Sequence, residues 1–141
     1  MLFCDTSALF KLYVNECASE GMATLGHSAS SVAVCRIPWV ESMAGFARRA
    51  RERLADVPGI EAAGRRLRRD RARFAIVEVT QPLVELAGDY ADTFALRGHD
   101  SVQLAAARTL QQAADEELHF ACVDVRLQRS AKVLGMSTVV T

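Results

Sequence analysis

The sequence predicts an α/β protein, a three-layer α/β/α sandwich built around a mostly parallel central sheet. Short apolar runs typical of buried strands alternate along the whole chain with longer segments of helical periodicity. With 141 residues, 50% of them hydrophobic and 24% charged, the chain can bury a substantial core. We therefore expect a single domain that spans residues 1–141.

The N-terminal part of the chain predicts two strands, each followed by a helix. Residues 1–4 form an apolar run, and Asp5-Thr6-Ser7 then offers N-cap chemistry for a helix. A short helix is expected near 19–27, and residues 31–35 indicate the next strand. Pro38 suits the first turn of a helix that we expect to run to about Val57.

A second long helix is expected over 60–74, after a break at Pro58-Gly59. One face of this helix is apolar and carries Ile60, Ala63, Leu67 and Phe74. Residues 75–80 then predict a strand that ends at Gln81-Pro82.

The C-terminal part continues the alternation. Helices are expected over 82–96 and 100–114, separated by Arg97-Gly98-His99. The run 119–123 predicts a strand, 124–134 a helix and 137–140 a last strand. This order favours parallel strands joined by helical crossovers.

Composition excludes several classes of protein. No apolar run approaches the ~20 residues of a membrane span, and the N-terminus lacks the basic start of a signal peptide. We therefore expect a cytoplasmic protein with no membrane partner. The cysteines contain no Cys-x-x-Cys pair, and we interpret them as reduced thiols, mostly of the core. They are Cys4, Cys17, Cys35 and Cys122.

Four carboxylates lie at the edges of apolar segments. Asp5 and Asp124 follow the strands expected at 1–4 and 119–123, and the carboxyl ends of parallel strands meet at the edge of the sheet where ligands bind. Asp100 opens an expected helix. Glu41 falls in the first turn of the helix that follows the 31–35 strand. The four side chains are thus expected to gather in one pocket.

Such a pocket suits Mg²⁺ or Mn²⁺, because these ions prefer oxygen ligands. Crowded carboxylates repel one another, so at least one should have a raised pKa when no metal is bound. A bound ion polarises a phosphate and lowers the pKa of a water, which is the chemistry of phosphodiester hydrolysis. Taken singly, each acid could instead cap or favour the start of a helix.

The segments that carry these acids resemble PIN-domain ribonucleases, and most closely the VapC toxins of bacterial toxin–antitoxin pairs. The resemblance covers essentially the whole chain in the expected order. It is carried by residues 2–13, by 30–41, by 96–107 and by 120–135. The first and third of these segments, LFCDTSALFKLY and LRGHDSVQLAAA, are the most specific.

This resemblance implies a function and a set of partners. The metal-binding and catalytic acids of the family match Asp5, Glu41, Asp100 and Asp124, and its small hydroxyl residue matches Thr6 or Ser7, of which we choose Ser7 as the substrate-positioning residue. Such enzymes cut RNA with Mg²⁺ or Mn²⁺ and form homodimers. A cognate antitoxin inhibits them by laying a C-terminal segment across the acidic groove.

Charge is unevenly distributed along the chain. Residues 48–73 hold ten arginines and four acids, a net charge of +6, while the rest holds seven basic and thirteen acidic residues, a net charge of −6. The arginine-rich segment could grip RNA phosphates, dock an acidic antitoxin segment or form a solvated helical face. Its candidate RNA- or partner-binding residues are Arg65, Arg66, Arg68 and Arg69.

Two other functions stay open. Pro38 and Trp39 depart from the family pattern before Glu41, which motivates the alternative of a catalytically silent PIN-like domain that only binds RNA or protein. A phosphate-signalling receiver domain also gathers acids around Mg²⁺, but it would need adjacent acids after the first strand and a lysine after a late one. Here Asp5 is alone and no usable lysine follows the last two strands, so we rank this alternative well behind. His99, beside Asp100, is interpreted as a loop histidine in preference to a general base.

Overall fold

The structure is a computed structural model that describes residues 1–14, 24, 26 and 28–140. Among these residues, five strands form one sheet of order β3-β2-β1-β4-β5, and every neighbouring pair is parallel. The strands are β1 (Leu2–Cys4), β2 (Val32–Cys35), β3 (Ala75–Val77), β4 (His119–Cys122) and β5 (Ser137–Val140). The predicted α/β class and parallel sheet are confirmed.

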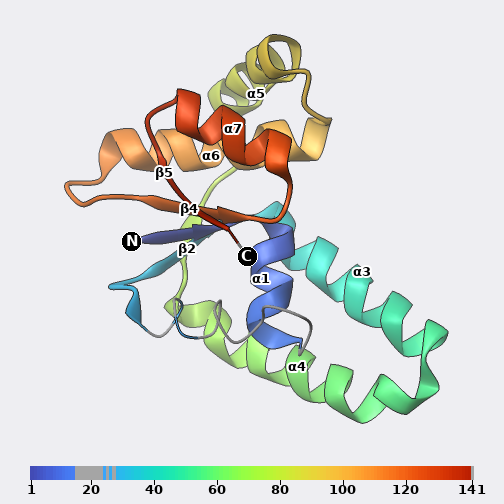
Figure 1. The fold of residues 1–141 in the computed structure, drawn as a ribbon. Coiled ribbons are helices and arrows are strands. Elements are labelled where there is room, and N and C mark those ends of the chain that lie inside the picture. Colours follow the sequence, from blue (N-terminus) through green and yellow to red (C-terminus); the bar gives the residue numbers. More distant parts are fainter. Residues whose placement is uncertain (15–23, 25, 27, 141) are drawn as a thin grey trace.

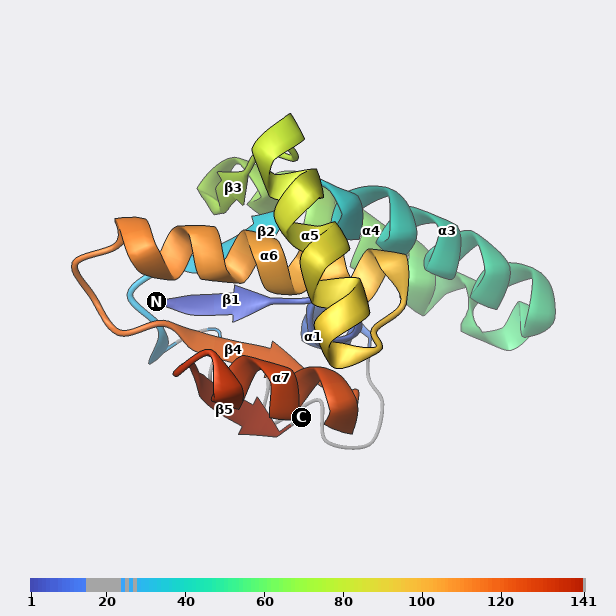
Figure 2. The ribbon, with the colours of Figure 1, turned by 90° about the horizontal axis from the view of Figure 1, so that it is seen from above.

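Helices cover both faces of the sheet, as the two ribbon views show (Figures 1 and 2). One layer consists of α1 (Thr6–Tyr13), α3 (Ile37–Glu52) and α4 (Val57–Asp70). The other consists of α5 (Gln81–Phe94), α6 (Gly98–Ala113) and α7 (Val125–Val133). This arrangement is the three-layer sandwich expected of a PIN-like fold. The hairpin of α3 and α4 extends beyond the end of the sheet (Figure 1).

Each strand divides its side chains between the two layers because successive residues point to opposite faces. Leu2 and Cys4 pack in the core beneath α1 and α4, whereas Phe3 packs in the core beneath α6. Phe3 and Phe120, from the neighbouring strands β1 and β4, are fully buried with ring centroids 5.7 Å apart. Together these contacts fix β1 at the centre of the molecule, where its carboxyl end positions Asp5.

The break between the two long helices lies earlier than predicted. Helix α3 ends at Glu52, a 3₁₀ turn spans Leu54–Asp56, and α4 begins at Val57. Pro58 and Gly59 therefore lie in the first turn of α4. The prediction of a break at Pro58-Gly59 was wrong because a first-turn proline has no intrahelical N–H bond to lose.

Helix α6 also begins earlier than predicted. The α5–α6 connection consists of Ala95–Arg97, and Gly98 and His99 already lie in the first turn of α6. Ala95 adopts a left-handed conformation with φ 51° and ends α5 in the way that glycine usually does. A second 3₁₀ turn, Arg71–Arg73, follows α4 before β3.

Cys4, Cys35 and Cys122 are buried free thiols, as predicted. Burial raises the pKa of the Cys35 thiol to about 11 and that of Cys4 further still, so both stay protonated. Cys17 lies outside the described residues, as does nearly all of the short helix expected near 19–27. In the described part of the chain, no helix has the length and apolar character needed to span a bilayer.

Candidate active site

Two acids lie where adjacent strands end. Asp5 directly follows β1, and Asp124 follows β4 after a single residue. Because β1 and β4 pair in parallel, both carboxylates emerge at the same edge of the sheet. Each also caps a helix: Asp5 accepts a hydrogen bond from the Ala8 N–H at 2.7 Å, and Asp124 accepts one from the Leu127 N–H at 2.9 Å. Helix capping and membership of the pocket are therefore compatible.

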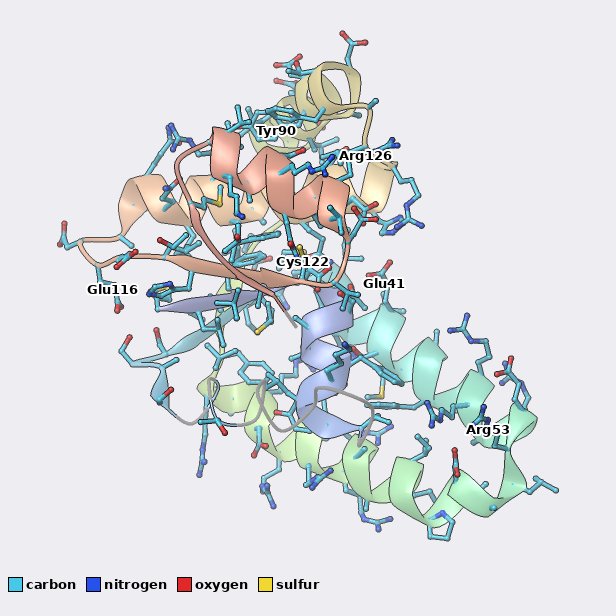
Figure 3. All side chains as sticks on the ribbon, viewed as in Figure 1. Glu41, Arg53, Tyr90, Glu116, Cys122 and Arg126 are labelled. Atoms are coloured by element: carbon cyan, nitrogen blue, oxygen red, sulfur yellow. The ribbon has the colours of Figure 1, made fainter. Side chains whose placement is uncertain are left out.

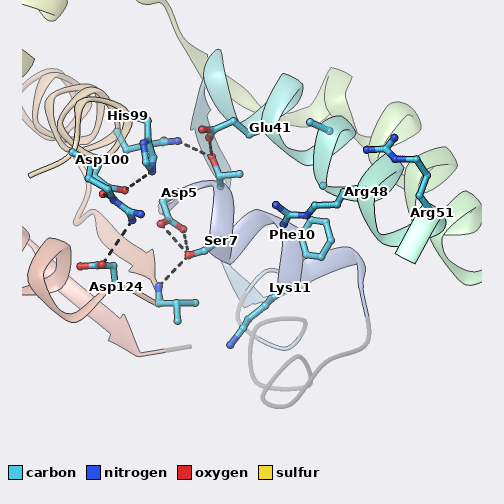
Figure 4. Close-up of a pocket in the computed structure, with 16 residues that line it drawn as sticks. Asp5, Ser7, Phe10, Lys11, Glu41, Arg48, Arg51, His99, Asp100 and Asp124 are labelled. Atoms are coloured by element: carbon cyan, nitrogen blue, oxygen red, sulfur yellow. Dashed lines mark hydrogen bonds and ion pairs between the residues drawn. The ribbon is translucent and has the colours of Figure 1, made fainter. Parts of the chain in front are cut away.

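Helices deliver the other two acids to this edge. Asp100 is the third residue of α6 and is only 7% exposed. Glu41 is the fifth residue of α3, just past the first turn where it was expected. Its side chain lies beside the start of α1, far from the tip of the hairpin where Arg53 lies (Figure 3). All four predicted acids line one open pocket of about 960 Å³ (Figure 4).

Asp5 is the most buried of the four, with 6% of its surface exposed. Burial raises its pKa from 3.8 to about 6, opposed by hydrogen bonds from Ala8 and Ser7 and reinforced by the negative charge of Asp100. A raised pKa in this cluster is thus confirmed. The larger cause is removal of the carboxylate from water, and the expected repulsion between acids contributes less.

Ser7 links Asp5, which follows β1, to Val123, which follows β4. Its hydroxyl lies 2.7 and 3.0 Å from the two carboxylate oxygens of Asp5, and its oxygen accepts a hydrogen bond from the Val123 N–H at 3.1 Å. Ser7 therefore fixes the orientation of the Asp5 carboxylate relative to the β4–α7 connection. This contact is structural, and a role toward substrate remains a prediction.

Thr6 links Glu41 of α3 to Gln103 of α6 on the opposite side of the pocket. Its hydroxyl donates to the Glu41 carboxylate and accepts from the Gln103 side-chain amide at 2.9 Å. Gln103 is buried and lies one helical turn after Asp100. The chain Gln103–Thr6–Glu41 thus holds a carboxylate from α3 against α1 and α6. Despite Pro38 and Trp39, Glu41 reaches the pocket.

A positive charge lies among the acids. The Arg97 guanidinium is 2.8 Å from an Asp100 oxygen and 4.0 Å from an Asp124 oxygen. His99 also contacts Asp100, with its Nε2 at 3.2 Å from the carboxylate. Arg97 therefore neutralises part of the negative charge that would otherwise accumulate at this edge. Figure 4 shows His99 beside Asp100.

The donor chemistry of the pocket fits a divalent ion, since all four acids offer hard carboxylate oxygens. Across the described residues, however, no three His, Cys, Asp or Glu side chains already converge into a metal cluster. The positively charged guanidinium of Arg97 already lies between Asp100 and Asp124. The hydroxyl groups of Ser7 and Thr6 hydrogen-bond to Asp5 and Glu41. Binding an ion would require local rearrangement of these side chains.

The predicted arginines of α4 do not line this pocket. Arg65 lies 3.8 Å from Glu61, Arg66 donates to the Tyr13 carbonyl at 2.6 Å, and Arg69 pairs with Asp70 at 3.0 Å. The pocket is lined instead by other cations that sequence reasoning did not single out, namely Lys11, Arg48, Arg51 and Arg97. Helical spacing from Glu41 could have found Arg48, which lies two turns further along α3.

Comparisons with known proteins give fold-level likenesses. No family model matches the chain, and no curated protein matches it. Among solved structures, the chain is similar to one described as a toxin–antitoxin complex from Klebsiella pneumoniae, with TM-score 0.63 and 19% identity over 88% of this chain and 87% of that chain. It is also similar to FitAcB from Neisseria gonorrhoeae, with TM-score 0.64 and 17% identity over 98% and 96% of the two chains. The chain thus shares the fold of these proteins.

Proposed function

We propose that this protein is a metal-dependent endoribonuclease that acts as the toxin of a toxin–antitoxin pair. The observation that carries the proposal is that Asp5, Glu41, Asp100 and Asp124, from four separate parts of the chain, line one pocket at the carboxyl edge of a parallel sheet. The residue-level resemblance to PIN-domain ribonucleases supports it, as does the shared fold of a structure described as a toxin–antitoxin complex.

The pocket's acids would hold the ion that this chemistry needs. Asp5, Asp100 and Asp124 are the proposed ligands, and Glu41 either joins them or orients the attacking water. Mg²⁺ or Mn²⁺, when bound, would supply electrostatic stabilisation of the phosphate and activation of water. No nucleophilic serine or cysteine is required.

The chain's own residues position this set. Ser7 holds Asp5, and Thr6 holds Glu41 with support from the buried Gln103. Glu41 is aimed into the pocket and, as a carboxylate, can accept a proton from water. Attack by water at phosphorus leaves a 5′-phosphate and a 3′-hydroxyl. A product with a 2′,3′-cyclic phosphate would rule out this mechanism.

Cleavage of total cellular RNA by the purified protein tests the proposal. We expect discrete fragments with Mn²⁺, none with EDTA, and none from Asp100→Asn with Mn²⁺. Asp92→Asn is the matched control, because Asp92 is an exposed residue of α5 outside the pocket. Fragments that persist in EDTA, or that Asp100→Asn still produces, would refute the proposed chemistry.

The toxin role adds two proposed partners, a cognate antitoxin and a second copy of the chain. Both rest on the resemblance and on the shared fold, and the RNA-cleavage assay does not test them. Co-expression with the protein encoded next to the toxin, followed by size-exclusion chromatography and light scattering, would measure both the complex and the homodimer. A monomer that binds no adjacent gene product would argue against these partners.

One observation favours the silent alternative, a PIN-like domain that binds RNA or protein without cleaving. Arg97 already pairs with two of the acids, and no metal cluster is preassembled among the described residues. Titration with Mn²⁺, followed by calorimetry, separates the two functions. A nuclease should bind the ion and lose that binding in Asp100→Asn, whereas a silent domain should show neither effect.

A further inference from the structure

The pocket has two chemically different ends. The acids gather at the sheet edge, while the opposite end extends along α3 and carries positive charge (Figure 4). The basic side chains of that end are Lys11, Arg48 and Arg51. An acidic end with a basic extension differs from a closed metal site, because the extension offers a path for an anionic chain.

Helix α3 builds this extension with one face. Glu41, Gly45 and Arg48 follow one another at spacings of four and three residues, which places them on the same side of the helix. At 1.5 Å per residue, Arg48 lies about 10 Å and Arg51 about 15 Å along the helix from Glu41. The two arginines therefore form a row that leads away from the acids.

Small residues line the path between the two ends. Ala44 and Gly45 line the pocket between Glu41 and Arg48. A Cβ atom on Gly45 would lie 3.0 Å from Cε2 of Phe10, which packs its ring at 5.0 Å from that of Phe46. The floor of the extension is thus close-packed beneath Gly45, and a side chain there would have to shift the Phe10 ring.

Within the described part of the chain, the basic residues of the extension have no acidic partner. Lys11, Arg48 and Arg51 make no ion pair with any of the described residues, and Arg48 and Arg51 are exposed. Several other arginines of the same segment are engaged within the protein. They include Arg49 with Asp56, Arg65 with Glu61, Arg66 with the Tyr13 carbonyl and Arg69 with Asp70.

We infer that Arg48 and Arg51 bind the phosphates of a single RNA strand that runs along α3, with the scissile phosphate at the acidic end. This inference rests on the proposed nuclease function and assigns the substrate contacts to α3 in place of the arginines of α4. Uncompensated guanidinium groups in a row beside a cleavage site suit a polyanion better than a mixed-charge peptide. Lys11, across the pocket from α3, adds a third positive charge to the same path.

Salt dependence of RNA binding tests the assignment directly. The double variant Arg48→Gln/Arg51→Gln is compared with Arg65→Gln/Arg68→Gln, which removes the same charge at the same spacing from exposed positions of α4. The probe is a fluorescein-labelled, mixed-sequence single-stranded RNA of about 20 nucleotides, measured by anisotropy in EDTA. Removing two phosphate contacts should lower the slope of log K against log salt by about 1.4 and weaken binding roughly tenfold.

A second variant tests the basic extension without removing an arginine. Ala44→Glu places a carboxylate one turn before Arg48, at the spacing of a helical ion pair, and should weaken RNA binding in the same direction. With Mn²⁺ and cellular RNA as substrate, both Ala44→Glu and the Arg48→Gln/Arg51→Gln variant should raise KM more than they lower kcat. The α4 control should match the wild type in every measurement.

The possible outcomes separate this inference from the proposed function. If the wild type cuts no RNA, the nuclease proposal fails, yet the EDTA titration still reports where RNA binds. If the wild type cuts RNA but the α3 pair leaves the salt slope and KM unchanged, the inference is overturned. A lower slope in the α4 pair would also overturn it. The inference is also overturned if the α3 pair loses binding of poly-glutamate while its RNA binding stays intact. That result would mean that the basic extension docks an acidic polypeptide.

Discussion

Replacing Asp5 by asparagine should stabilise the metal-free protein at neutral pH. Burial holds the pKa of Asp5 at about 6 in the folded protein, against an ordinary value of 3.8, so folding favours the protonated form. The stability that this proton preference contributes is fully present below about pH 4 and is lost as pH rises through 6. At pH 7 the ionised carboxylate therefore costs about 3 kcal/mol, from a shift of roughly two units at 1.36 kcal/mol each.

Asparagine avoids that cost and keeps the local structure. Its side-chain oxygen can still accept from the Ala8 N–H, as the Asp5 carboxylate does at 2.7 Å. We expect Asp5→Asn to be about 3 kcal/mol more stable than the wild type at pH 7 and equally stable near pH 4. The corresponding rise in Tm at pH 7 is about 10 °C.

Urea denaturation at pH 4, 5, 6 and 7 in EDTA measures this difference, with Asp92→Asn as the control for the substitution itself. A variant that is less stable than the wild type at pH 7, or a difference that does not change with pH, would refute the reasoning. Saturating Mn²⁺ should then stabilise the wild type more than Asp5→Asn, because an ion stabilises the folded protein that binds it and the variant lacks one proposed ligand. Under the proposed nuclease function, Asp5→Asn should therefore be more stable than the wild type and inactive.

Three further changes probe the surroundings of the site. Arg97→Gln should lower the Tm of the metal-free protein and tighten Mn²⁺ binding in calorimetry, because the guanidinium no longer competes for Asp100; weaker Mn²⁺ binding would contradict this. Thr6→Val should reduce nuclease activity and cost about 1–3 kcal/mol in urea denaturation, since the buried amide that bonds Thr6 loses its acceptor; unchanged stability would argue against the chain to Glu41. Phe120→Ala should cost about 3–5 kcal/mol in the same assay, and a smaller loss would mean that the core collapses around the cavity.

The alternation of apolar runs with helical periodicity was sufficient to predict the fold class. Short runs such as 1–4 and 119–123 became neighbouring parallel strands, and the N-cap residues Asp5 and Asp124 marked the starts of the helices that follow. Helix boundaries near proline and glycine were predicted less well. The first turn of a helix tolerates Pro58 and Gly98 as readily as a loop does, so a turn-forming residue alone cannot locate the break.

The site was predictable to the extent that strand polarity determines it. Asp5 and Asp124 had to share an edge once both strands were parallel and adjacent. The buried amide of Gln103 and the guanidinium of Arg97 carried no comparable signal, and Thr6 was only the second choice for the family's hydroxyl residue. Their roles come from contacts between α1, α3 and α6, which are distant in the sequence.

By itself the sequence determined which residues this protein buries, where its strands end and therefore which acids share one edge of the sheet, because periodicity and capping are local properties of a chain. Only the tertiary structure decided which cations belong to that edge. Residues 48–73 carry arginines in both of their clusters, four in 48–53 and six in 65–73. Yet α3 presents Arg48 and Arg51 to the pocket, whereas Arg66 and Arg69 of α4 are engaged elsewhere. Charge acts through distance in space, and the packing of the helices sets that distance.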